Sequence, residues 1–354
     1  MKALKLFLPL ILAPLLAAAG FYIWWLFSDR VKGAPADAAY IFGDGPPPGP
    51  APGLDQATEG ARQAFDFSRS HEEEPQEWWY FNAHLLDQKN RRYGLMFALL
   101  RTGQVLGSFT MVQHGRHYKM HQTGAVVLQP LLRLVTAPMS RFEQLDRWKF
   151  NYEFRLDHPM AEFTLRLKAA KFPLAVGGDG LIDMGDGGRS YYYSLTNMAV
   201  EGEGRIRGKD VELHGKGWMD HQWGDWNDRE FDQWFWYSIQ LADNTEILIF
   251  EFRRHSKART PVCDVVAPDG QVRHGLPYVI RPLKNWVSPT TGRNWSVGWT
   301  VRIPDLDADL KITPDLEDQE VTKSLWEGVC KVDGRYAGRP AKGVAFYEAR
   351  QRTW

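Results

Sequence analysis

Two aromatic segments, far apart in the chain, match each other position by position. The first, "EWWYFNAHLLD", covers residues 77–87, and the second, "QWFWYSIQLAD", covers residues 233–243. Superposition pairs Trp78 with Trp234, Asn82 with Ser238, His84 with Gln240, Leu85 with Leu241 and Asp87 with Asp243. A loop and an apolar strand ending in arginine follow each segment, as "YGLMFALLR" and "EILIFEFRR". This internal repeat predicts two related structural units.

Most of the remaining chain has the pattern of short β-strands. Segments such as "KFNYEFRLD", "EFTLRLKAA" and "SVGWTVRIP" alternate polar and apolar residues, and turns such as "PDG" and "MGDGG" separate them. The main helix-like stretch, residues 128–148, is interrupted by Pro130 and Pro138. Many short strands with regular turns indicate antiparallel barrels or sandwiches. We therefore expect an all-β fold, with one unit per repeat and a boundary near residues 202–208.

The second aromatic segment is expected to form a hairpin with the strand that follows it. If Asp243 and Asn244 form a two-residue turn, Trp236 lies opposite Glu251. One face then carries Trp234, Trp236, Ser238, Gln240, Glu251 and Arg253, and the other carries Phe235, Tyr237, Ile239, Leu241, Leu248, Phe250 and Phe252. The apolar face is expected to pack, and the mixed face to form a pocket wall. A turn one residue longer would shift this register.

The N-terminal region has the features of a membrane-spanning segment. Lys2 and Lys5 precede an uncharged run at residues 6–27, which is long enough to cross a bilayer as a helix. Small residues in "LLAAAG" resemble a signal-peptide cleavage site, but "FYIWWLF" continues the apolar run. We expect an uncleaved membrane anchor at residues 1–28, with a cleaved signal as the alternative. Either places the body outside the cytoplasm, as in the periplasm.

A Pro/Gly-rich segment at residues 29–64 follows the apolar run and is expected to be an extended tether, because it cannot bury enough surface to offset its ordering entropy. The two β domains are then expected at residues 65–205 and 206–354.

Charge composition narrows the classes of partner. Lysine plus arginine and aspartate plus glutamate number 43 each, so the chain offers no electrostatic argument for nucleic acid. The sequence contains no Gly-rich phosphate loop, and no serine nucleophile elbow is visible. We expect no cofactor and no nucleic-acid partner, and the sequence identifies no protein partner.

The cysteines and three clustered histidines are the residues that could form a cross-link or bind a metal. Cys263 and Cys330 could pair in an oxidising compartment, but we favour two separate buried thiols because sequence cannot supply the required Cα geometry. His114, His117 and His121 would not share one face of a strand. No metal site is predicted.

The segment "HGKGWMDHQWGDWND", residues 214–228, mixes carboxylates with indoles. Asp220 stands close to Trp218 and Trp223, and a carboxylate crowded by indoles loses hydration, which raises its pKa. Asp220 is therefore a candidate general acid, with His221 as its partner or base. The alternative is a tight turn in which the tryptophans only fill a domain junction.

Four motifs together resemble a known family. "EWWYFNAHL", "GWMDHQWGDW" followed by "FWYSIQL", and "LWEGVCKVDG" at Leu325 resemble the hydroxyneurosporene synthase (carotenoid 1,2-hydratase) family and its AttH-like relatives, from about Phe65 to the C-terminus. The resemblance implies two tandem lipocalin-like antiparallel β-barrel domains after the expected N-terminal transmembrane helix. It also implies chemistry on an apolar small molecule, and it supports Glu77 and Asp220 as functional residues.

These features favour a hydratase-like enzyme that adds water to a double bond of an isoprenoid or other lipid-like molecule. Asp220 would protonate the alkene, His221 or Glu77 would orient the water, and aromatic faces would stabilise the carbocation. The expected substrate-binding residues are Trp78, Tyr80, Asn82, His84, Trp218, Trp223, Trp234, Trp236 and Glu251. The alternatives are a membrane-tethered lipid carrier without chemistry and a lipid hydrolase, which would lack an evident nucleophile.

Overall fold

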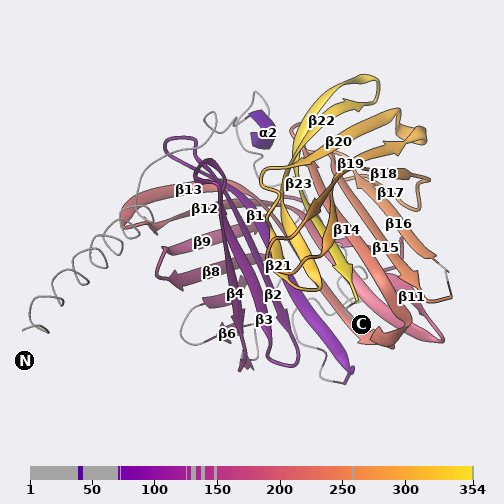
Figure 1. The fold of residues 1–354 in the computed structure, drawn as a ribbon, viewed down its shortest axis with the longest axis horizontal. Coiled ribbons are helices and arrows are strands. Elements are labelled where there is room, and N and C mark those ends of the chain that lie inside the picture. The colour runs from indigo at the N-terminus through magenta and orange to yellow at the C-terminus, as the bar shows by residue number, and fades with distance from the viewer. Residues whose placement is uncertain are drawn as a thin grey trace, which may run out of the picture. The chain divides into compact units, whose positions relative to one another are not determined.

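The computed structural model describes residues 39–42, 71, 73–124, 126–128, 133–136, 140–146, 150–256 and 259–352. Within these ranges the chain is almost entirely β-structure, with one short α-helix, α2 (Ala39–Phe42) (Figure 1). The same ranges contain three 3-10 helices of three residues each, η2 (Val112–His114), η3 (Asp228–Glu230) and η4 (Pro304–Leu306). The all-β prediction is confirmed. The expected anchor or signal at residues 1–28 lies outside the described residues. In the part of the chain that is described, no helix has the length and apolar character needed to span a bilayer.

The first sheet is antiparallel and has the strand order β4-β3-β2-β1-β13-β12-β9-β8-β7-β6-β5, with β10 and β11 pairing to β12. Its strands are β1 (Gln76–Asp87), β2 (Arg92–Leu100), β3 (Val105–Met111), β4 (Arg116–Gln122), β5 (Val126–Leu128), β6 (Arg133–Thr136), β7 (Ser140–Asp146), β8 (Asn151–His158), β9 (Ala161–Ala169), β10 (Leu174–Ala175), β11 (Leu181–Gly185), β12 (Gly188–Ile206) and β13 (Lys209–Asp225). The helix-like stretch at residues 128–148 contains the strands β6 and β7 instead.

The second sheet is also antiparallel and has the order β17-β16-β15-β14-β23-β22-β20-β19-β18, with β21 pairing to β22. Its strands are β14 (Phe231–Leu241), β15 (Glu246–Arg254), β16 (Arg259–Val266), β17 (Val272–Arg273), β18 (Val279–Val287), β19 (Asn294–Ile303), β20 (Ala308–Pro314), β21 (Glu320–Thr322), β22 (Leu325–Tyr336) and β23 (Arg339–Gln351). Both sheets curl, as expected for tandem lipocalin-like units (Figure 1).

The strand order reproduces the internal repeat. In each sheet the first four strands follow in reverse order, and the first strand then pairs with the last: β1 with β13, and β14 with β23. The boundary expected at residues 205–206 falls inside the β12–β13 hairpin of the first sheet. The chain enters the second sheet later, between Asp225 and Phe231, because β13 is needed to pair with β1.

Strand alternation divides the aromatic bulk into three layers. Odd-numbered residues of β1, such as Trp79 and Phe81, belong to a core inside the first sheet, which we call the first inner core. Odd-numbered residues of β14, such as Tyr237, belong to the second inner core. Even-numbered residues of both strands, including Tyr80 and Trp236, form a third layer between the sheets, the inter-sheet layer. The two segments are apolar at nearly every position because both faces of each strand are buried.

The β14–β15 hairpin differs from the expected register. Its turn has three residues, 242–244, closed by a 2.8 Å hydrogen bond from the backbone N–H of Leu241 to the carbonyl of Thr245. Asn244 takes the left-handed conformation that this turn requires, with φ of 65°. Trp236 consequently lies opposite Phe250, and Glu251 faces the second inner core. The placement of Glu251 on the Trp236 face was therefore wrong, because the turn is one residue longer.

The helix α2 corrects the expectation of a wholly extended tether at residues 29–64. Ile41 is fully buried in a small cluster with Leu86 and Val344, and Phe42 stacks on His214 with ring centroids 5.7 Å apart. Tyr40 donates a 2.9 Å hydrogen bond to Asp333. This part of the chain is thus packed on the β-structure.

Two buried ion pairs connect the sheets at their common layer. Arg92 of β2 lies 2.8 Å from Asp315, and Lys171 lies 2.6 Å from Glu246 of β15. Burial makes such pairs expensive to break, since either partner alone would be an uncompensated charge. The two thiols of Cys263 and Cys330 are buried and unpaired, which confirms that expectation.

Candidate active site

The inter-sheet layer brings equivalent positions of the repeat into contact. Asn82 donates a 3.2 Å hydrogen bond from Nδ2 to Oγ of Ser238, the residue that the repeat matches to it. Tyr80 and Trp236, which are also matched, pack edge to face with ring centroids 5.0 Å apart. The repeat axis therefore passes close to these side chains, and β1 and β14 face each other across it.

Asp220 lies in this layer, on β13 opposite Tyr80. Its carboxylate accepts hydrogen bonds from Tyr192 Oη at 2.7 Å, Ser194 Oγ at 2.5 Å and Trp218 Nε1 at 2.7 Å. Burial raises the pKa of Asp220 to about 6, although the three hydrogen bonds act in the opposite direction. Trp236 donates a 2.9 Å hydrogen bond to the Tyr192 hydroxyl, which continues the network into the second sheet.

Two glutamates of the second sheet complete a carboxylate cluster with Asp220. Glu327 on β22 and Glu348 on β23 stand directly opposite each other. The Tyr80 hydroxyl donates to Glu327, and Asn82 donates to the Tyr80 oxygen at 3.0 Å. The Trp234 indole donates to Glu348.

Burial raises the pKa values of this carboxylate cluster, and mutual repulsion raises those of its two glutamates further. Burial first, and then the Glu348 carboxylate, raise the pKa of Glu327 well above its usual range. Burial raises the pKa of Glu348 to about 7, and the charge of Asp220 also raises the pKa values of both glutamates. Like charges in a buried site cannot all ionise together, so the cluster retains protons near neutral pH.

The two glutamates were not predicted from the sequence, although signals for them exist. Glu327 lies within the motif "LWEGVCKVDG". Glu348 lies opposite Trp236, just as Asp220 lies opposite Tyr80, so it occupies the position equivalent to Asp220 in the repeat. Extending the superposition to the last strand of each unit would have found it.

Glu77, His221 and Trp223 lie on the other face of the first sheet. Nε2 of His221 is 2.9 Å from Oε1 of Glu77, and its Nδ1 is 3.3 Å from the Tyr193 hydroxyl. Burial raises the pKa of Glu77 to about 7. Trp223 packs in the first inner core and stacks on the His71 ring.

This placement corrects the expected pairing of Asp220 with His221. Adjacent residues of a strand point to opposite faces, so the sheet separates the two side chains. Asp220 and Glu77 do not meet for the same reason. The six expected residues Trp78, Tyr80, Asn82, Trp218, Trp234 and Trp236 do share the inter-sheet side with Asp220.

His84 also lies on the inter-sheet side, farther along β1, whereas Glu251 does not. His84 is buried against Phe346, with ring centroids 4.8 Å apart, and burial, Arg92 and Lys216 lower its pKa. Glu251 lies on the opposite face of β15 from the inter-sheet layer.

Trp78 and Trp234 are half-buried and mark the edge of the inter-sheet layer. Trp78 packs edge to face on Trp226 at 5.2 Å, and the guanidinium of Arg350 lies 4.2 Å from the centre of a Trp234 ring. A cavity of about 190 Å³ is lined by Trp234 and Arg350. Because Trp234 also donates to Glu348, it connects this cavity with the carboxylate cluster.

The arrangement combines proton donors, proton acceptors and aromatic faces in a buried layer. Carboxyl groups with raised pKa values can donate or accept protons near neutral pH. The adjacent indole and phenol rings can stabilise a cation through their π faces. Such a site suits proton transfer to and from an apolar molecule.

Comparisons with known proteins place these features in a family context. A family model described as AttH-like matches residues 60–349. A dehydratase from Emericella nidulans, asqC, is 24% identical over 209 residues, which cover 54% of this chain and 58% of that protein. The match thus spans less than two thirds of this curated relative.

Two crystal structures share the fold. A protein from Nitrosomonas europaea described as AttH superposes with a TM-score of 0.68 at 21% identity, covering 79% of this chain and 94% of that one. Kievitone hydratase from Nectria haematococca superposes with a TM-score of 0.71 at 16% identity, covering 92% and 98%. At these identities the two structures establish the fold alone.

Proposed function

This chain belongs to the AttH-like family, and from that premise we propose that it is a hydratase-like enzyme. It would add water to, or remove water from, a carbon–carbon double bond of an apolar isoprenoid or lipid-like molecule. The names of two relatives, a hydratase and a dehydratase, support this reaction class. The observation that carries the proposal is the carboxylate cluster of Asp220, Glu327 and Glu348 among aromatic rings.

The different environments of Glu327 and Asp220 suggest their roles. Glu327 has the strongly raised pKa and is therefore the proton donor at neutral pH. Asp220 is held by three donors that favour its ionised form, so it is the group that accepts a proton. This division revises the expectation that Asp220 is the acid.

The reaction is balanced by two proton transfers. Glu327 gives a proton to one alkene carbon, and the resulting cation is stabilised by the faces of Tyr80 and Trp236. The oxygen of water bonds to the other carbon, and Asp220 accepts the proton that this water releases. A proton then returns from Asp220 to Glu327, and the site regains its starting charge. Dehydration follows the same steps in reverse.

Neither His221 nor Glu77 has a role in this scheme, because both lie on the other face of the sheet. The reaction scheme does not require the membrane attachment expected from residues 1–28. It also does not require a carotenoid as the substrate. A carotenoid is one of the candidate apolar substrates.

The test is an isotope-labelling experiment with the full-length protein. The protein would be incubated with a lipid extract and with a carotenoid in water enriched in heavy oxygen, beside the Asp220→Asn and Glu327→Gln variants. Label in an intact product of the wild type alone supports hydration. Asp157→Asn, an exposed substitution on β8, is the matched control and should behave as wild type.

Two other outcomes would reject the enzyme proposal in this form. Label in cleaved fragments would show a hydrolase. An unlabelled lipid that remains bound to the wild type and to both variants would show a carrier.

A further inference from the structure

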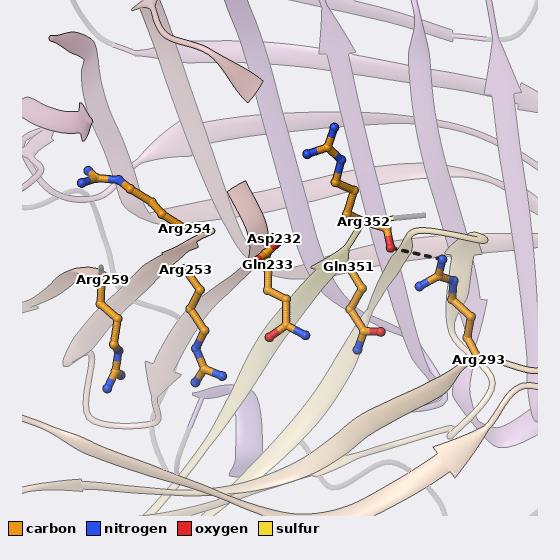
Figure 2. Close-up of a pocket in the computed structure, with 8 residues that line it drawn as sticks. All are labelled: Asp232, Gln233, Arg253, Arg254, Arg259, Arg293, Gln351 and Arg352. Atoms are coloured by element: carbon orange, nitrogen blue, oxygen red, sulfur yellow. Dashed lines mark hydrogen bonds between the residues drawn. The ribbon is translucent and has the colours of Figure 1, made fainter. Parts of the chain in front are cut away.

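A groove of about 820 Å³ lies beside the small cavity at Trp234. Its lining residues are Asp232, Gln233, Arg253, Arg254, Arg259, Arg293, Gln351 and Arg352 (Figure 2). The adjoining cavity adds Arg229, Arg350 and Asp228. The two cavities together are lined by seven arginines, two aspartates and no lysine, in a chain whose charges balance. We call this region the arginine groove.

The topology of the second sheet gathers these residues at one edge. Gln233 of β14 lies opposite both Arg253 of β15 and Gln351 of β23, and Arg253 lies opposite Arg259 of β16. The ends of four neighbouring strands therefore meet here. In Figure 2 the side chains of Arg253 and Arg259 extend in one direction, together with the two glutamines that share this row. The donor groups of these four residues thus point the same way, whereas the side chains of Arg254 and Arg352 extend away from them.

One carboxylate serves two of these guanidinium groups. Nε of Arg253 donates to Glu251 at 2.7 Å, and Arg259 donates to the other oxygen of the same carboxylate. Glu251 can neutralise only one of the two positive charges. A guanidinium has five N–H donors in a planar fork, so both arginines retain donors for a second acceptor.

The other side of the groove is held by hydrogen bonds to neutral oxygens. Arg293 donates to the carbonyl of Arg352 at 3.3 Å, and Arg352 donates to the carbonyl of Arg229 at 2.7 Å. Seven arginines line the two cavities, and the nearby carboxylates are those of Asp228, Asp232, Glu251, which pairs with Arg253 and Arg259, and Asp183, which pairs with Arg254. An oxyanion bound between the guanidinium groups would relieve their mutual repulsion.

Trp234 joins the arginine groove to the carboxylate cluster. It lines the smaller cavity, lies beneath the Arg350 guanidinium and donates its indole N–H to Glu348. Gln233 and Arg253 lie on the Glu251 face of the sheet and Trp234 lies on the inter-sheet face, but the smaller cavity is lined by both Gln233 and Trp234. A molecule with its charged end in the groove would therefore pass around the strand ends and lay its apolar part along Trp234. This geometry matches an amphipathic molecule better than a free anion.

We propose that the arginine groove binds the anionic head group, a phosphate or a carboxylate, of the apolar substrate. This inference rests on the proposed hydratase function, since it specifies the substrate class of the same site. The substrate would be an isoprenoid or lipid-like chain that carries an oxyanion at one end.

The experiment measures binding by the full-length protein rather than turnover. The probes are farnesyl monophosphate, farnesol, which lacks only the phosphate, and inorganic phosphate, each titrated by calorimetry at low salt. We expect farnesyl monophosphate to bind ten- to a hundredfold more tightly than farnesol, as charge-assisted hydrogen bonds to arginine require. It should also bind more tightly than inorganic phosphate.

Variants assign this preference to the groove. Arg259→Gln should reduce the preference for the phosphate about tenfold. Because this change alone removes a partner of the Glu251 carboxylate, the double variant Glu251→Gln, Arg259→Gln, which also removes that charge, should show the same reduction. Arg166→Gln, an exposed arginine on the first sheet, is the matched control and should retain the preference. Asp220→Asn should bind as wild type does, which separates head-group binding from catalysis.

Three results would overturn the proposal. These are equal affinity for farnesyl monophosphate and farnesol, equal affinity for farnesyl monophosphate and inorganic phosphate, or the same preference in the Arg259 and Arg166 variants. Hydration of a neutral lipid with no head-group preference would reject this inference while leaving the proposed function standing. Head-group binding without any hydration would reject the proposed hydratase function and leave the groove as an anion-binding site.

Discussion

Replacing Asp220 with asparagine should change the pH dependence of stability in a defined direction. The pKa of this carboxyl rises from 3.8 in an unfolded chain to about 6 in the buried site. Each pKa unit corresponds to about 1.4 kcal/mol, so the shift amounts to roughly 3 kcal/mol. A carboxyl whose pKa is higher in the folded state stabilises the fold while it is protonated. That contribution is complete below pH 3.8 and is lost as the pH rises to about 6.

The Asp220→Asn variant keeps the size of the side chain but cannot ionise, so it does not lose this contribution. We expect the variant to gain stability relative to wild type by about 3 kcal/mol between pH 4 and pH 7.5. Urea unfolding at several pH values, followed by tryptophan fluorescence, measures the difference. Because the charge of Asp220 also raises the pKa values of Glu327 and Glu348, its removal should enlarge the gain rather than reduce it.

The result that refutes this reasoning is a pair of parallel stability curves for wild type and Asp220→Asn. Parallel curves would mean that Asp220 is as well solvated in the folded chain as in the unfolded one. The exposed Asp157→Asn substitution should give a curve parallel to that of wild type and controls for the general effect of removing a carboxylate. A variant that is more stable and inactive would fit a site that sacrifices stability for activity.

Further predictions concern the site, the sheet contact and the N-terminal region. Glu327→Gln should lower kcat about 10²- to 10⁴-fold and leave substrate affinity nearly unchanged, measured by steady-state kinetics once a substrate is known; an equal loss in Asp157→Asn would count against it. Asp315→Ala should destabilise the fold by about 3–5 kcal/mol because it strands the buried Arg92, and a loss below about 1 kcal/mol in urea unfolding would contradict a buried ion pair. Gly215→Ala should also destabilise strongly, since its Cβ would lie 1.9 Å from the His84 carbonyl oxygen, and an unchanged melting temperature would refute the close approach. If residues 1–28 direct the β-structured part of the chain out of the cytoplasm, protease added outside the cytoplasmic membrane of intact cells or spheroplasts should digest that part. Protection from the protease until the membrane is dissolved would reject that location.

The sequence predicted the strands and the repeat well because both depend on local patterns. Alternating polar and apolar residues indicate a strand wherever one face of the sheet meets water. The superposition of residues 77–87 on residues 233–243 predicts that the two segments form equivalent strands of two sheets, as β1 and β14 do. The direct contact of Asn82 with Ser238 follows from that equivalence once the sheets face each other.

Face assignments were less predictable because they depend on single residues. The third residue in the turn at 242–244 moved Glu251 to the opposite face, and the neighbouring positions of Asp220 and His221 suggested a partnership that a strand forbids. Glu327 and Glu348 join Asp220 only through the pairing of distant strands, so local patterns could not show the carboxylate cluster.

The contact between matched residues at the repeat axis bears on how such a site can arise. A single unit of this kind would present its first and last strands as a self-complementary surface, and two copies would associate as an isologous dimer. In that dimer every residue near the axis would occur twice, so an acid would face the same acid. Joining the copies in one gene removes that constraint. Here the matched positions hold unlike residues: Asp220 and Glu348, Tyr80 and Trp236, and Asn82 and Ser238. Duplication and fusion would thereby allow unlike residues to occupy matched positions at the centre of a symmetric scaffold.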